Sequence, residues 1–114
     1  MRTRLSGSVK VFSPPYRREE LIALLRARLP ALASEIPLLR VVLFGSWAQG
    51  KATAFSDIDL LVVYAGPPRD DAYQRVQRSL SLRGLQPHVY AEREAEQMKN
   101  TLERMSRNGV VLMG

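Results

Sequence analysis

The run of residues Ile58–Tyr64 limits more than any other feature how this chain can fold. Apart from Asp59, its members are apolar or aromatic, so the run is predicted to be a buried β-strand. The following Ala65-Gly66-Pro67-Pro68 ends the strand, because glycine and proline favour turns over regular structure. A buried strand needs other strands beside it and helices packed on the sheet, so the rest of the sequence must supply both.

Other segments carry the patterns of those strands and helices. The segment Leu39–Phe44, apolar and β-branched apart from Arg40, predicts a second strand, which Gly45 breaks. Leucines at helical spacing predict a helix over about residues 15–34, with a start signal at Ser13–Pro15 and with Pro30 able to end or kink it. The other predicted elements are an edge strand at 9–12, a turn or short helix at 45–50, a helix at about 70–83, a strand at 86–90, a helical stripe over 91–105 and a return to the sheet at 110–112.

This order of elements predicts an α+β (or mixed α/β) fold, with a small mixed sheet backed by helices on one side. The 114 residues suit one small domain. We expect that domain to span residues 9–114, after a loose tail at residues 1–8.

Composition and charge exclude several classes of protein. No apolar run approaches the roughly 18 residues of a membrane-spanning helix, and the first residues lack the apolar core of a secretory signal. The absence of cysteine excludes disulfides and cysteine metal sites, and it fits a cytoplasmic protein. A net charge of +6 favours a polyanionic partner such as a nucleoside triphosphate, RNA or an acidic protein. An arginine-rich solvated surface would give the same balance.

A possible phosphate-binding turn follows the strand that ends at Phe44. Gly45 has no side chain, so the backbone N–H groups of the next residues can approach an anion closely. Ser46 adds a hydroxyl donor, and the positive end of a helix starting there would add attraction. An ordinary turn would show the same two residues, so this signal alone is weak.

Two carboxylates follow Ser46 after ten intervening residues. Asp57 and Asp59 are two positions apart at the start of a strand, so both point to one face of the sheet. Like charges this close repel unless a cation lies between them, and hard oxygen ligands suit Mg²⁺. A cap and turn at Ser56-Asp57 would explain Asp57 without a metal, but it leaves Asp59 unexplained.

The two features together resemble a known family. From Val41 to Val63 the chain reads Val-Val-Leu-Phe-Gly-Ser-Trp-Ala-Gln-Gly-Lys-Ala-Thr-Ala-Phe-Ser-Asp-Ile-Asp-Leu-Leu-Val-Val. Gly-Ser, ten residues and then Asp-x-Asp before an apolar strand is the signature of the polymerase-β-type nucleotidyltransferases, and this stretch is similar to the minimal nucleotidyltransferase subfamily. The order of helices and strands over most of residues 9–112 resembles that family's core as well.

The resemblance implies an activity and a site. Gly45 and Ser46 would hold the triphosphate of a substrate such as ATP, and Asp57 and Asp59 would hold the divalent cation, Mg²⁺ or Mn²⁺. The family transfers a nucleotidyl group to an acceptor hydroxyl and releases pyrophosphate. Lys51 would balance phosphate charge, although a solvated lysine in a loop needs no such role.

One departure from the family pattern concerns a third acidic residue on a later strand. The matching segment reads Leu85-Gln86-Pro87-His88-Val89-Tyr90, so His88 takes the acidic position. Neutral imidazole prefers softer metals than Mg²⁺, but it can act as a general base near neutral pH. A lone histidine is more often structural. Glu92 or Glu94 could replace the missing acid, although both suit the first turn of a helix.

The resemblance also implies a partner. Minimal nucleotidyltransferases are paired with helical HEPN-domain toxins, and the small chain is an antitoxin that can transfer AMP to a tyrosine of the toxin. A second hypothesis is a binding module that neutralises its partner by contact alone, because His88 stands where an acid is expected. Direct nucleic-acid binding rests only on the charge and is not expected, since no aromatic-rich basic motif is present. A homo-oligomer is possible, and no membrane partner is expected.

Overall fold

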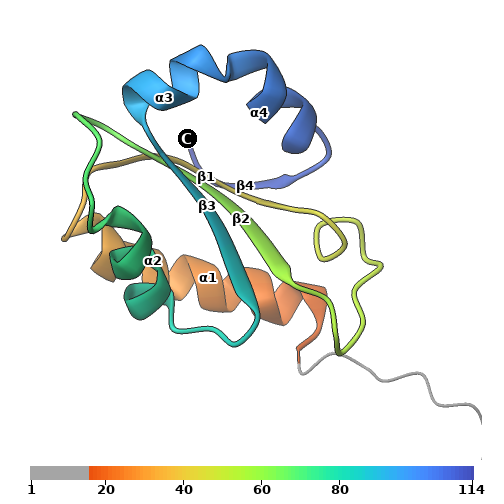
Figure 1. Cartoon of the computed structure of the whole chain (residues 1–114). Helices are drawn as coiled ribbons and strands as arrows, with labels where there is room; N and C mark the ends of the chain where they lie inside the picture. Colours follow the sequence, from red (N-terminus) through yellow and green to blue (C-terminus); the bar gives the residue numbers. More distant parts are fainter. Residues whose placement is uncertain (1–15) are drawn as a thin grey trace, which may run out of the picture.

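The computed structural model describes residues 16–114, which form a four-stranded sheet between two pairs of helices (Figure 1). Among the predicted features, the tail at residues 1–8, the edge strand at 9–12 and the helix start at Ser13–Pro15 lie outside the described residues. The elements in chain order are α1 (Arg18–Ala33), β1 (Leu38–Phe44), β2 (Ile58–Tyr64), α2 (Ala72–Leu80), β3 (Leu85–Ala91), α3 (Glu92–Gln97), α4 (Lys99–Met105) and β4 (Val110–Met113).

The sheet has the strand order β3-β2-β1-β4. Strand β2 runs antiparallel to β1 and parallel to β3, while β4 pairs antiparallel with β1, so the sheet is mixed as predicted. The side chains of Leu60, Leu61 and Val62 in β2 are completely buried. The bounds of β2 match the predicted strand. Its apolar side chains leave water only if the whole segment lies inside the sheet.

One face of the sheet is covered by α1 and α2, which lie together below it in Figure 1. The leucines at helical spacing in α1 are buried against alternate residues of the strands, including Val41, Leu60 and Val62. Val76 and Leu80 of α2 join the same core. This layer is the one that the helical spacing of the sequence predicts.

The opposite face is covered by α3 and α4, so the expectation of helices on one side only is wrong. Val42, Leu61 and Val63 point to this second face and pack with Leu102 of α4. The physical reason is the apolar run itself. Successive side chains of a strand point to opposite faces, so a strand without polar alternation needs cover on both.

Several boundaries differ from the sequence prediction. Pro30 lies inside α1 without ending it, and its carbonyl accepts a hydrogen bond from the N–H of Ser34 just beyond the helix. The helical stripe over 91–105 is divided into two short helices at Met98, whose φ of −107° leaves the helical region. Residues 45–50 form turns and no helix. The division into a tail and a domain over 9–114 stays a prediction. Within the described residues, no helix is long and apolar enough to cross a membrane.

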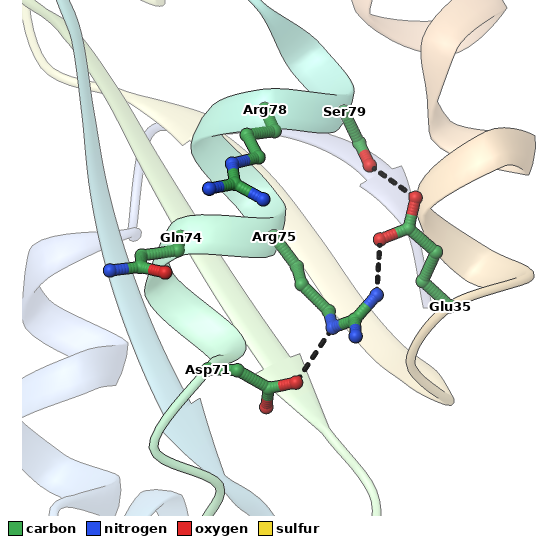
Figure 2. A pocket seen from close by; sticks show the side chains of 6 residues that line it. All are labelled: Glu35, Asp71, Gln74, Arg75, Arg78 and Ser79. Atoms are coloured by element: carbon green, nitrogen blue, oxygen red, sulfur yellow. Dashed lines mark hydrogen bonds and ion pairs between the residues drawn. The ribbon is translucent and has the colours of Figure 1, made fainter.

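An ion-pair cluster joins the end of α1 to α2 (Figure 2). Arg75 donates hydrogen bonds to Asp71 at 2.7 Å and to Glu35 at 2.9 Å, and Ser79 donates to the other oxygen of Glu35. The guanidinium of Arg75, and then that of Arg69, holds the pKa of Asp71 at about 2. Arg75 also lowers the pKa of Glu35. This cluster lines an open hollow that contains none of the predicted site residues.

The cluster predicts a specific sensitivity to acid. The folded state holds the pKa of Asp71 below its value in the unfolded chain, so stability is complete above that unfolded value and falls between about pH 4 and pH 2. Replacing Arg75 by Met should make this loss smaller over the same range, because the largest cause of the lowered pKa of Asp71 is removed while Arg69 still acts on it. Urea denaturation midpoints measured from pH 5 to pH 2 check this. Arg26→Met, on the exposed side of α1, should leave the wild-type profile.

The second helical layer predicts that a truncated side chain in the small core under α4 lowers the free energy of unfolding. Leu102→Ala should lower the free energy of unfolding by about 2–4 kcal/mol, because it removes a buried leucine that packs on Val42, Leu61 and Val63. Leu39→Ala is the matched control, since the Leu39 side chain is 43% exposed and should cost much less. Chemical denaturation measures both. Equal losses would show that α4 contributes nothing to stability through this contact.

Candidate active site

The predicted phosphate turn follows β1 directly. Gly45 has a φ of +76°, a left-handed conformation that glycine adopts without strain. Three backbone hydrogen bonds close the turn. The N–H of Gln49 donates to the carbonyl of Gly45, that of Gly50 to the carbonyl of Trp47, and that of Lys51 to the carbonyl of Ser46. The N–H groups of Ser46 and Trp47 take no part in these bonds. They are the donors that such a turn offers to an anion.

The turn is fixed to the start of α1. Trp47 is 2% exposed, and its ring lies 6.4 Å from that of Tyr16. The Nε of Arg18 donates a hydrogen bond to the carbonyl of Ala48 at 3.1 Å. A helical arginine 30 positions away therefore holds the turn in place. The sequence marks Arg18 only as a surface residue of a helix, and no local pattern signals this contact.

Asp59 lies beside the turn because of the register between two strands. Antiparallel pairing of β1 and β2 places Phe44 opposite Asp59, so the end of β1 meets the start of β2. A Cβ atom at Gly45 would lie 2.5 Å from Oδ2 of Asp59, a distance that real contacts essentially never show. Only glycine therefore fits at position 45 while Asp59 keeps this position. The structure brings two of the predicted site residues into direct contact.

Asp57 is exposed and immediately precedes β2. Ile58, between the two aspartates, is buried in the α1 and α2 core, so the backbone alternation turns Asp59 to the other face. Within residues 16–114, no group of three or more histidine and carboxylate side chains is close enough to hold a metal ion by itself. A cation held here would need further oxygen ligands from its substrate or from water.

His88 reaches the same place from β3. Parallel pairing of β2 and β3 puts His88 next to Leu61, and its Nε2 lies 3.6 Å from Oδ1 of Asp59. The ring of Phe44 packs on the imidazole with 5.1 Å between centroids. Nε2 is shielded from solvent and has no hydrogen-bond partner in the described part of the chain. A carboxylate and an unpartnered ring nitrogen that face each other fit a shared cation.

The other candidates of the sequence are not brought to Asp59. Oε1 of Glu94 accepts a hydrogen bond from the N–H of Ala91 at 2.8 Å and so caps the start of α3. Glu92 lines a hollow under α3 and α4 together with Leu39, at the start of β1. Lys51 is exposed, and its N–H closes the turn. Neither glutamate therefore replaces the missing third acid.

The chain belongs to the nucleotidyltransferase domain family, whose sequence pattern matches residues 25–109. The matched region includes the Gly45 turn, both aspartates and His88. A four-stranded mixed sheet with helices is consistent with the polymerase-β-like fold that the sequence predicts. Membership of this family supports nucleotidyl transfer as the general activity, and the family generally uses a nucleoside triphosphate and a divalent cation.

Solved structures show the same fold. A candidate nucleotidyltransferase from Sulfolobus solfataricus is 24% identical, with a TM-score of 0.55, and the match covers 83% of this chain and 81% of that one. A toxin–antitoxin complex with AMP-PNP is 26% identical, with a TM-score of 0.55, over 78% and 73% of the two chains. A structure of a tri-AMPylated Shewanella oneidensis HEPN toxin in complex with an MNT antitoxin is 24% identical, with a TM-score of 0.54, and the match covers 82% of this chain and 72% of that one.

These neighbours and the family match confirm the predicted resemblance to the minimal nucleotidyltransferases. No curated protein matches the sequence.

The contact between Gly45 and Asp59 predicts a difference between two glycine substitutions. Gly45 and Gly50 both have positive φ, so an alanine at either should cost about 1–2 kcal/mol of backbone strain. Only at position 45 does the new Cβ collide with Asp59, since nothing lies within 4 Å at position 50. Gly45→Ala should therefore lose more free energy of unfolding than Gly50→Ala in urea titrations. Equal losses would mean that Asp59 moves aside at no cost.

Proposed function

We propose that this chain transfers AMP from ATP to a hydroxyl group of a partner protein, and that the partner is a HEPN-domain toxin for which the chain is the antitoxin. The support for the transfer reaction is the family match over residues 25–109. The support for the partner is the likeness to toxin–antitoxin complexes, one with AMP-PNP and one with a tri-AMPylated HEPN toxin. A cytoplasmic location fits the cysteine-free sequence.

The observation that carries this proposal is the direct approach of the Gly45 turn to the Asp59 carboxylate. A turn with N–H donors attracts the phosphates, while the carboxylate would repel them. The two are useful side by side only when a cation neutralises the charge between them. A purely structural turn has no need to bring a strand aspartate to within contact of a glycine.

Each residue of the site has a proposed task in this reaction. The N–H groups after Gly45 and the hydroxyl of Ser46 bind the triphosphate, and Arg18 holds that turn against α1. Asp57 and Asp59 hold the divalent cation, Mg²⁺ or Mn²⁺. When bound, the cation supplies neutralisation of the phosphate charge and orientation of the α-phosphate.

The reaction forms one bond and breaks one. The acceptor hydroxyl gives its proton to solvent water, its oxygen bonds to the α-phosphorus, the bond from that phosphorus to the bridging oxygen breaks, and pyrophosphate leaves with the electron pair. The contribution of the protein is to hold the phosphates and acceptor in line, because positioning supplies most of the catalysis of phosphoryl-group transfer. His88 completes the proposed site beside Asp59.

A second candidate function is an antitoxin that neutralises its partner by contact alone. One observation favours it: within the described residues, no third carboxylate joins Asp59, and the side chains next to it on β3 are Gln86 and His88, neither of which is a carboxylate. A site with fewer carboxylates holds a cation less tightly, so catalysis would be slow or absent. The two functions differ in whether protection of the partner needs the aspartates.

The double variant Asp57→Asn/Asp59→Asn tests the proposal. Transfer of labelled AMP to the partner should fall at least about 100-fold, because loss of the cation removes several kcal/mol of charge stabilisation. Asp70→Asn, an exposed aspartate before α2, is the control and should keep wild-type transfer. The fluorescence of Trp47, the one tryptophan of the chain, is measured in two further experiments. Its change during denaturation follows folding, and its change during titration with ATP follows nucleotide binding, because Trp47 lies in the phosphate turn.

Toxin neutralisation by the same double variant separates the two functions. If protection of the partner is lost with transfer, the enzymatic antitoxin stands. If the folded double variant transfers nothing and still protects fully, the contact-only function replaces it. Unchanged transfer would overturn the assignment of the two aspartates.

A further inference from the structure

His88 is the single histidine of the sequence, and its ring nitrogen faces a carboxylate without bonding to it. The separation of 3.6 Å between Nε2 and Oδ1 of Asp59 is too long for a hydrogen bond. Nε2 is nevertheless shielded from solvent and has no partner within the described residues. Buried polar atoms are nearly always satisfied, so an orphaned one calls for a partner from outside the chain, either water or an ion.

The gap between the two atoms has the size that a shared cation requires. Protein nitrogen and oxygen ligands lie about 2.1 Å from a small divalent ion, so two ligands at 90 to 120° around it stand about 3.0 to 3.6 Å apart. The observed separation falls at the upper end of this range. The Asp59 side chain keeps 30% of its surface exposed, so an ion can enter from the Asp59 side.

The imidazole is held in this position by its surroundings. The ring of Phe44 packs on it from β1, and the pairing of β2 with β3 fixes its backbone beside Leu61. The residue of β3 that pairs with Asp59 is Gln86, a neutral amide. His88 therefore offers the one basic ring nitrogen next to Asp59, and no carboxylate from β3 competes with it.

We propose that His88 is a ligand of the divalent cation together with Asp59, and that it shifts the preference of the site from Mg²⁺ toward Mn²⁺ and Co²⁺. The inference rests on the proposed function, because it names which ion that function uses. Mg²⁺ strongly prefers oxygen ligands, whereas imidazole suits the later divalent metals. As a ligand, Nε2 gives its lone pair to the ion and does not take the proton of the acceptor hydroxyl.

The direct test is pulsed electron paramagnetic resonance of Mn²⁺ bound to the tag-free chain. Inorganic tripolyphosphate supplies the phosphates in this experiment without adding any nitrogen atom. The buffer is set at about pH 8, above the pKa of free imidazole. Because the chain has one histidine, coupling of the Mn²⁺ spin to imidazole ¹⁴N would identify His88 as the ligand. We expect this coupling in the wild type and its loss in His88→Asp and His88→Asn.

Metal preference is measured by calorimetry on the same proteins. The ratio of the Mg²⁺ dissociation constant to that of Mn²⁺ should fall about 10-fold or more in His88→Asp, because oxygen replaces nitrogen at the ion. Gln86→Asp is the matched control. It adds a carboxylate beside Asp59 and keeps the imidazole, so it should tighten both ions while leaving the ratio near the wild-type value. Circular dichroism confirms that each variant is folded.

The outcomes separate this inference from the function on which it rests. Mn²⁺ that binds, is lost in Asp59→Asn and shows no imidazole coupling would overturn the role of His88 and leave the proposed function standing. An unchanged metal ratio in folded His88→Asp would do the same. If Mn²⁺ does not bind the wild type even with tripolyphosphate, the inference and the metal-dependent function both fail.

Discussion

The side chains of β2 are buried on both faces of the sheet, and the positions of the other elements follow from that burial. Residues that point to one face meet α1 and α2, and those that point to the other meet α3 and α4. The apolar run fixes where the strand lies, and it therefore fixes where the strand begins. Asp59, its second residue, stands at the edge of this core with 30% of its side chain exposed. A carboxylate there is held by a rigid strand, which a functional site needs more than it needs a flexible loop.

The register between β1 and β2 places this rigidly held carboxylate beside the turn that follows β1. Because Phe44 stands opposite Asp59, the turn after β1 starts in contact with the carboxylate, and only glycine fits at position 45 while Asp59 keeps this position. The same pairing carries the Phe44 ring to the imidazole of His88 on β3. Three strands thus contribute one neighbouring residue each, and the sheet needs no long loop to bring them together. A turn that is also bonded to α1 through Arg18 has little freedom to move away.

The sequence predicts the parts of the fold that depend on local pattern. The bounds of β2 and the strand that ends before Gly45 both follow from residue type and spacing. The sequence does not predict contacts that join distant positions. The Arg18 bond to Ala48 and the Arg75 bond to Glu35 each depend on how separate elements pack, and surface arginines at helical spacing look alike whether or not they bond. The second helical layer was missed for a different reason, since its cause was present in the apolar run Leu60–Val63 of β2, which has no polar alternation.

The charge around Asp59 affects how a cation and a nucleotide would bind to the proposed site. With Gln86 and His88 as its neighbours on β3, the carboxylate receives no further negative charge from that strand. A site of low negative charge attracts a bare divalent cation weakly, but it also repels a triphosphate weakly. The chain's net charge of +6 attracts the negatively charged nucleotide. Under the proposed function, the cation is therefore expected to arrive already bound to the phosphates, so nucleotide and metal should bind cooperatively rather than one after the other.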